Sequence, residues 1–204
     1  MTRTLALRLL QLVVSCVVLG VGVALLLDAR LGSDGYSMFV SGLSIATGVS
    51  FGLVNAGVGV VLVLLAWARG RRPGVGTLVQ AVLVGYVVAW TMPLLPGPDD
   101  LPLRCAELAA GFVVVCLGVA GYLAADLGAG PAEGAALAFD PPVPFRWSYT
   151  VLQVGGALVG WLCGASLGLG TVIVALLVGP VVDRLLRWWR ERAVRTAPVG
   201  PPAR

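Results

Sequence analysis

The stretch that decides the fold class is Leu9–Leu27, LLQLVVSCVVLGVGVALLL, which lies between Arg8 and Asp28. It carries no charged side chain, and as a helix it is long enough to cross the apolar core of a bilayer, about 30 Å thick. Further uncharged stretches follow along the chain, over Gly35–Ala68, Pro73–Pro98, Leu108–Ala125 and Trp147–Val182. The sequence therefore predicts an all-α integral membrane protein.

Composition supports this class and excludes several kinds of enzyme. Of the 204 residues, 58% are hydrophobic and only 12% are charged, whereas soluble domains carry about 25% charge. The chain has no His and no Lys, which excludes Ser-His and Cys-His nucleophile pairs, zinc sites of the HExxH type and Schiff-base lysines. The four cysteines show no CxxC spacing. We expect no enzyme, no metal and no cofactor.

The number of spans depends on two long stretches. Trp147–Val182 has a glycine-rich middle, Gly164–Gly170, and accommodates two helices joined by a tight turn. Gly35–Ala68 accommodates either two cramped spans or one span preceded by a short membrane-buried segment. Arginine placement favours the second interpretation, because Arg30 and Arg104 are then the only arginines outside and the other twelve are cytoplasmic.

The predicted fold thus has six transmembrane helices, with a short non-spanning helix, surface-lying or re-entrant, within 35–50. Such a chain is expected in the bacterial cytoplasmic (inner) membrane as a multi-pass protein with both termini in the cytoplasm. Its net charge of +4 does not predict nucleic-acid binding, because the arginines lie at the ends of apolar segments.

An internal repeat divides the chain into 1–98, 99–190 and a tail, 191–204, that we expect to be disordered. At an offset of 96, Gly22-Val23-Ala24 and Leu31-Gly32 recur as Gly118-Val119-Ala120 and Leu127-Gly128. At an offset of 94, the pairs are Phe51 with Phe145, Trp67 with Trp161, and Gly74-Val75-Gly76-Thr77 with Gly168-Leu169-Gly170-Thr171. Three spans per half is an odd number, so the two halves are predicted to form inverted repeats, as in many secondary transporters.

From about Gly20 to Leu186 the chain resembles the bacterial YczE/YyaS/YitT-type integral membrane proteins, whose biochemical function is unassigned. The residues that carry the resemblance are Leu127–Pro131, Gly160–Leu162, Gly168–Thr171 and Gly179-Pro180. The resemblance also implies charges that this chain lacks. Ala132-Glu133-Gly134 stands where such proteins carry Arg-Asp-Gly, and Tyr149 and Gln153 stand where they carry an Arg and a Glu.

Polar residues on apolar helices are the remaining functional signal, because polar groups in hydrocarbon need partners. Tyr149, Gln153, Gly156 and Gly160 share one helix face, and Gly48, Gly52, Asn55 and Gly59 repeat that spacing. Each stripe has two interpretations, either close helix packing with an interhelical hydrogen bond or the lining of a polar pathway. The candidates for a substrate pathway are Asn55, Gln80, Tyr149, Gln153 and Glu107, the last as the acid expected within the membrane.

Two Gly-x-Gly-Thr turns open predicted spans and give the candidates for anion binding at a helix terminus, Gly76, Thr77, Gly170 and Thr171. Free N–H groups at a helix start carry partial positive charge. The preferred interpretation, however, is that the glycines serve only a tight hairpin.

The sequence thus favours a transporter-like protein for a small solute. The alternative is a non-transporting membrane accessory or scaffold protein. The expected partners are the lipid bilayer, a small solute and, for the scaffold, further copies of the chain.

Overall fold

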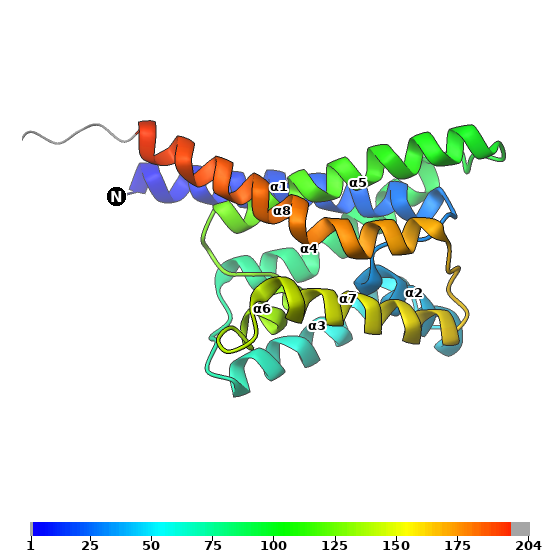
Figure 1. The fold of residues 1–204 in the computed structure, drawn as a ribbon, viewed down its shortest axis with the longest axis horizontal. Helices are drawn as coiled ribbons and strands as arrows, with labels where there is room; N and C mark the ends of the chain where they lie inside the picture. The colour runs from blue at the N-terminus through cyan, green and yellow to red at the C-terminus, as the bar shows by residue number, and fades with distance from the viewer. Residues whose placement is uncertain (1, 197–204) are drawn as a thin grey trace, which may run out of the picture.

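The computed structural model describes residues 2–196, and it describes side chains within 5–189. All regular elements in this part of the chain are helices, and it contains no strand (Figure 1). Its elements are α1 (Thr2–Asp28), α2 (Gly35–Thr47), α3 (Phe51–Ala68), α4 (Val75–Thr91), the 3₁₀ turn η1 (Met92–Leu94), α5 (Leu101–Ala124), α6 (Pro131–Leu137), α7 (Phe145–Leu162) and α8 (Leu169–Thr196).

Five of these helices are long and apolar enough to cross a membrane, namely α1, α3, α4, α5 and α8. Helix α7, the fifth span expected from the sequence, does not belong to this set, because its first turns carry Arg146 and several polar side chains. The expected split of Trp147–Val182 is present, since α7 and α8 are separate helices with a turn between them. The boundary expected at residue 98 falls in the loop before α5. Of the tail expected over 191–204, α8 includes the part up to Thr196 and the rest lies outside the described residues.

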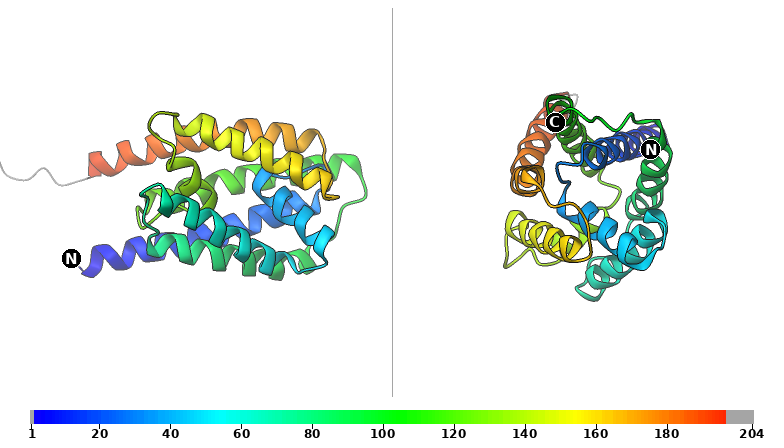
Figure 2. Two further views of the ribbon diagram at one scale, coloured as in Figure 1. Left: turned by 90° about the horizontal axis from the view of Figure 1, so that it is seen from below. Right: turned by 90° about the vertical axis from the view of Figure 1, so that its right-hand side faces the viewer.

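The long helices run side by side along one axis, so the molecule has two ends (Figures 1 and 2). The terminal end, as we call it, holds the start of α1, the end of α8 and the loops 69–74 and 125–130, which are joined by contacts such as Arg8 Nε to Ala125 O. The opposite end holds the loops 29–34, 95–100 and 163–168, joined by Gly170 N–H to Leu31 O and Gly97 N–H to an Asp28 carboxylate oxygen.

Two short helices, α2 and α6, begin in the interior rather than at an end. Asp34 caps α2 by accepting a hydrogen bond from Ser37 N–H at 3.0 Å, and Gly48, with φ of 71°, closes it at the opposite end. Helix α6 begins at Pro131, where a missing N–H costs nothing, and ends on the terminal-end side. Helix α2 packs mainly on α7, and α6 on α3, so each short helix pairs with a long helix of the other half.

The two halves make equivalent contacts. Helices α1 and α5 cross where a Cβ on Gly22 would lie 2.7 Å from Val115 N, and a Cβ on Gly118 would lie 2.7 Å from Leu19 Cα. Positions 22 and 118 differ by 96, as do Leu19 and Val115. Helix α4 packs on α1 as α8 packs on α5. The residues with a left-handed backbone after α1 and α5, Arg30 (φ 52°) and Asp126 (φ 51°), also differ by 96.

Candidate functional site

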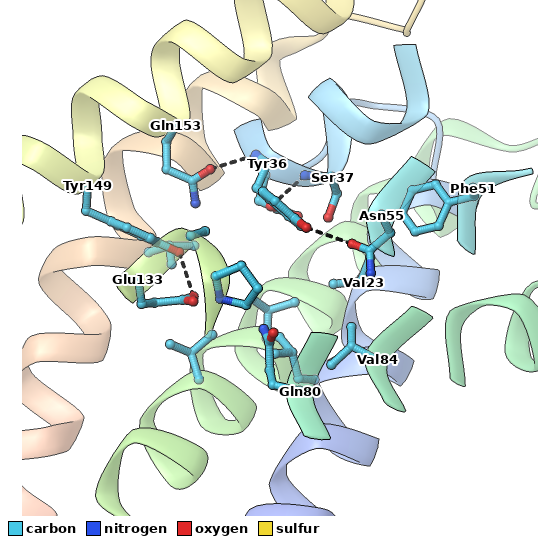
Figure 3. Close-up of a pocket in the computed structure, with 17 residues that line it drawn as sticks. Val23, Tyr36, Ser37, Phe51, Asn55, Gln80, Val84, Glu133, Tyr149 and Gln153 are labelled. Atoms are coloured by element: carbon cyan, nitrogen blue, oxygen red, sulfur yellow. Dashed lines mark hydrogen bonds between the residues drawn. The ribbon is translucent and has the colours of Figure 1, made fainter. Parts of the chain in front are cut away.

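A cavity of about 40 Å³ lies at the centre of the molecule, between the first turns of α2 and α6 (Figure 3). This volume has room for about three water molecules. Valines and other apolar side chains from α1, α4, α5 and α8 form part of its wall. The polar lining residues are Asp34, the N-cap of α2, Tyr36 and Ser37 on α2, Asn55 on α3, Gln80 on α4, Glu133 on α6, and Tyr149 and Gln153 on α7.

A line of hydrogen bonds joins four helices along one side of this cavity (Figure 3). Gln153 Oε1 accepts from Tyr36 N–H at 2.9 Å. Tyr36 Oη donates to Asn55 Oδ1 at 2.8 Å, and Asn55 Nδ2 donates to Ala81 O at 3.0 Å. Asn55 and Gln153 are 4% and 1% exposed, so these bonds satisfy polar groups that would otherwise be buried without partners.

Glu133 occupies the other side of the cavity. Its side chain is 4% exposed, and its Oε1 accepts a hydrogen bond from Tyr149 Oη at 3.3 Å (Figure 3). Its Oε2 is buried and has no hydrogen-bond partner. A cavity next to an unsatisfied carboxyl oxygen is the arrangement expected where a ligand completes the site.

The structure brings together four of the five residues predicted to line a pathway, Asn55, Gln80, Tyr149 and Gln153. Glu107, the fifth candidate, lies apart from these four. Glu107 lies in the second turn of α5, near Asp28 at the opposite end, and does not line the cavity. The glutamate that lines the cavity is Glu133.

Sequence reasoning gave Glu133, Asp34 and Tyr36 no role in a pathway. Tyr36 falls in the segment expected to be surface-lying or re-entrant, and Asp34 and Glu133 lie outside the predicted spans. A signal was nevertheless present. The resemblance implies charges that this chain lacks at positions 132, 149 and 153 and an acid that it keeps at 133, and all four positions line the cavity.

The two Gly-x-Gly-Thr turns are used for packing between the halves. Gly76 N–H donates to Leu127 O at 2.8 Å, and Gly170 N–H donates to Leu31 O at 3.0 Å. Thr77 N–H and Thr171 N–H donate to the carbonyl oxygens of Gly74 and Gly168 within their own turns. Because these donors already have protein partners, the geometry favours the hairpin interpretation over an anion site.

The stripe on α7 combines both of its interpretations. Tyr149 and Gln153 face the cavity, whereas Gly156 and Gly160 lie against the backbone of α2, where a Cβ on Gly160 would be 2.3 Å from Met38 O. On the α3 stripe, Asn55 faces the cavity and a Cβ on Gly59 would lie 3.5 Å from Pro131. The small residues thus hold the short helices in place, and the polar residues of the same stripes line the space at their first turns.

Two further hollows lie toward the two ends of the molecule. The larger, about 460 Å³, lies at the terminal end and is lined by Arg71, Arg72, Asp126 and Pro131 among others. Pro131 also lines the central cavity. The smaller, about 100 Å³, lies at the opposite end and is lined by residues that include Arg30, Gly32 and Ser33. The loop residues 30–33 correspond to 126–129 at the offset of 96, so the two hollows occupy equivalent places and differ in size.

Comparison with known proteins places the chain in a family. Residues 6–187 match the model of a family of unknown function, DUF6198. The chain belongs to this family. It is 30% identical over 173 residues to an uncharacterised protein of Haemophilus influenzae, covering 83% of this chain and 78% of that protein. It is 24% identical over 213 residues to the uncharacterised membrane protein YczE of Bacillus subtilis, covering 99% of each chain.

The resemblance to YczE-type membrane proteins is therefore confirmed, and the chain is a membrane protein of unknown function. No solved structure matches it. The function must be argued from the site itself.

Proposed function

We propose that the chain is a transporter-like protein for a small solute, built from two inverted repeats of three spans each. The observation that carries the proposal is the central cavity, because the first turns of two short helices from opposite halves form it together. Secondary transporters with inverted repeats hold their substrates at such a place, near the bilayer midplane and at the start of discontinuous helices.

The path of the chain supports six crossings, made by the five apolar helices and by α7. Helices α1, α4 and α7 each begin at the terminal end, and α3, α5 and α8 each begin at the opposite end (Figure 1). Helix α7 has 18 residues, about 27 Å of helix. Its Tyr149 and Gln153 face the cavity, and its one charged residue, Arg146, is exposed in the first turn. A span whose polar face is covered by protein does not need a uniformly apolar sequence.

The equivalent contacts of the two halves support the inverted repeat. Contacts at the terminal end in one half recur at the opposite end in the other, which is what a two-fold axis in the membrane plane produces. In this proposal α2 and α6 are re-entrant, each running from the midplane to one surface. The irregular backbone before each helix is tolerated at that depth only where protein or a water-filled cavity covers it.

The arginines support an orientation. The loop 69–72, the start of α7 and the end of α8 carry most of them and lie at the terminal end, whereas Arg30 and Arg104 lie at the opposite end. By the positive-inside rule we assign the terminal end, with both chain termini, to the cytoplasm of a bacterial inner membrane. The larger hollow is then on the cytoplasmic side. Unequal hollows at equivalent places are what an alternating-access protein presents in one of its two states.

The experiment is a solute screen followed by uptake. Purified protein is heated with a panel of small cations, amines, amino acids, carboxylates and sugars, and any solute that raises the melting temperature is then measured for uptake into proteoliposomes. We expect saturable uptake that Gln153→Ala reduces at least tenfold. Gln11→Ala is the matched control, because Gln11 Nε2 donates to Gly121 O at 2.9 Å on an interface away from the cavity. If no solute is stabilising and none is taken up, the scaffold alternative replaces this proposal.

A further inference from the structure

The cavity contains two carboxyl groups that differ in their partners. Asp34 is 7% exposed, and both of its oxygens accept hydrogen bonds, Oδ1 from Ser33 Oγ at 3.2 Å and Oδ2 from Ser37 N–H at 3.0 Å. Asp34 is thereby accounted for as the cap of α2. Glu133 is buried as deeply, and the hydroxyl groups of Tyr149 and Tyr122 interact with its carboxyl group. Its Oε2 nevertheless has no partner at hydrogen-bond geometry. Burying an ionised oxygen without a partner is costly, so Glu133 is the carboxyl group of the cavity that a bound ligand would stabilise.

Gly130 lets the carboxyl group of Glu133 approach the side-chain amide of Gln80. A Cβ built on Gly130 would lie 2.6 Å from Glu133 Oε2 and 2.8 Å from the Gln80 amide, so both groups pack directly against this glycine. Gln80 reaches it from α4 and Glu133 from α6 (Figure 3). Two side chains from different halves, both of which line the cavity, thus converge beside Gly130.

The charge of the lining selects the kind of ligand. None of the described residues that line the cavity is basic, while the lining offers carboxyl, amide and hydroxyl oxygens. The rings of Tyr36, Tyr149 and Phe51 stand in the same wall, and aromatic faces attract cations. The remaining wall is largely apolar, which strengthens any charge interaction inside it. An anion would meet two carboxyl groups here and no counter-charge.

The number and size of the groups limit the charge of the ligand. Within the described residues no group of three or more His, Cys, Asp or Glu side chains could hold a metal ion, whereas divalent cations such as Ca²⁺ take six to eight oxygens and usually several carboxylates. Only one carboxyl oxygen of the cavity lacks a partner, and the cavity measures about 40 Å³. A small ligand with one positive charge fits this description.

We propose that the solute of this cavity is a small monovalent cation, an alkali, ammonium or short alkylammonium ion, bound by the carboxylate of Glu133 with Gln80 and Tyr149 beside it. This inference rests on the proposed transport function, since it names the substrate class of the same site.

The test measures thermal unfolding of the purified protein in lipid nanodiscs with chloride salts of sodium, potassium, ammonium, methylammonium and tetramethylammonium. Total ionic strength is held constant with N-methylglucamine chloride, whose cation is too large for the cavity. We expect at least one of these ions to raise the melting temperature saturably, and Glu133→Gln to weaken its apparent affinity at least tenfold. Glu107→Gln is the matched control. Glu107 also has a buried oxygen without a partner, but it lies outside the cavity, so the affinity should stay within twofold of wild type.

A second variant keeps the carboxylate in place in case Glu133→Gln does not fold. Gly130→Ala places a methyl group against Glu133 Oε2 and the Gln80 amide, which must both move, and should weaken the apparent affinity for the ion at least fivefold. Equal ion affinities in wild type and in both variants would overturn the inference. It would also be overturned if no cation raised the melting temperature, which is the result expected when Glu133 holds a proton throughout. Stabilisation by neutral or anionic solutes alone would overturn it and leave transport standing. Ion binding without uptake into proteoliposomes would leave this inference standing and remove the transport proposal.

Discussion

Arg8 in α1 and Arg104 in α5 make the same hydrogen bonds in opposite halves of the chain. Arg8 Nε donates to Ala125 O at 2.8 Å, and Arg104 Nε donates to Ala29 O at 2.8 Å. Their Nη2 atoms donate to the carbonyl oxygens of the next residues, Asp126 and Arg30. Each guanidinium thus satisfies carbonyl groups at the end of a partner helix, where four carbonyls lack intrahelical partners.

This relationship predicts equal and additive losses of stability. Arg8→Met and Arg104→Met should each lower the free energy of unfolding by about 1 kcal/mol, because each removes charge-assisted hydrogen bonds that are partly exposed. The double variant should lose the sum, since the two sites lie at opposite ends and share no partner. Unfolding in mixed micelles with increasing SDS measures this.

The control separates the backbone bonds from the ion pair that Arg8 makes with Asp126, whose side chain is 93% exposed. Asp126→Asn keeps a residue that tolerates the left-handed backbone at this position and should change stability by less than about 0.5 kcal/mol. A loss in Arg8→Met with none in Arg104→Met would contradict the equivalence of the two ends.

Labelling from outside the cell tests whether α7 crosses the membrane. In a variant whose four cysteines are replaced, single cysteines at Val143, before α7, and at Leu167, after it, are exposed to a membrane-impermeant maleimide on intact cells. Both side chains are at least 40% exposed in the structure. We expect labelling of Val143→Cys only after lysis and of Leu167→Cys without it.

The controls for this labelling are Arg71→Cys, expected to be protected at the terminal end, and Asp99→Cys, expected to be labelled at the opposite end. If Val143→Cys and Leu167→Cys respond alike, α7 does not cross, and the inverted repeat of three spans per half is lost with it.

Much of the helix arrangement could be predicted from charges alone. The uncharged stretch Leu9–Leu27 lies within α1, and the glycine-rich turn within Trp147–Val182 falls between α7 and α8. The starting depth of α2 and α6 could not be predicted, because neither periodicity nor composition records how far a loop returns into the molecule before a helix begins. Glu133 therefore received no role from the sequence, although the loop before α6 carries it to the cavity at the centre.

The position of Glu107 could not be predicted for a related reason. It follows the loop of residues 95–100 and opens an apolar stretch, a pattern that is equally compatible with a place at the membrane surface or one turn inside it. In the structure Glu107 lies in the second turn of α5, beside Asp28. By contrast, the stripe that begins at Tyr149 and Gln153 depends only on helical spacing, and spacing is a property that the sequence does carry.

Helix α2 is held on α7 by glycines, and this predicts a position-specific cost of adding a methyl group. A Cβ on Gly160 would lie 2.3 Å from Met38 O and 2.9 Å from Phe39 N, which are backbone atoms. Gly160→Ala must therefore separate the two helices and should cost about 1–3 kcal/mol of unfolding free energy.

Gly155 on the same helix provides the control, because nothing lies within 4 Å of a Cβ there. Gly155→Ala should leave stability unchanged or raise it by up to about 1 kcal/mol through helix propensity. Equal destabilisation by the two variants would mean that α7 is sensitive to any added methyl group, and the close packing on α2 would not be the cause.

Thr77 and Thr171 stand at equivalent positions of the repeat but have different partners, which predicts unequal effects of one substitution. Thr77 Oγ1 donates to Ala129 O at 2.6 Å and accepts from Gly74 N–H at 3.2 Å. Thr171 Oγ1 donates to Met38 Sδ at 3.0 Å, a weak acceptor.

Both side chains are at most 5% exposed, so exchange to valine keeps their shape and removes only the hydroxyl. Thr77→Val leaves a partly buried donor and a partly buried acceptor without these partners and should cost about 1–3 kcal/mol. Thr171→Val leaves only a thioether and should cost less than half as much. Unfolding of the two variants side by side measures the difference, and an equal cost would show that the hydroxyl bonds to the loop of residues 125–130 do not stabilise the contact between the halves.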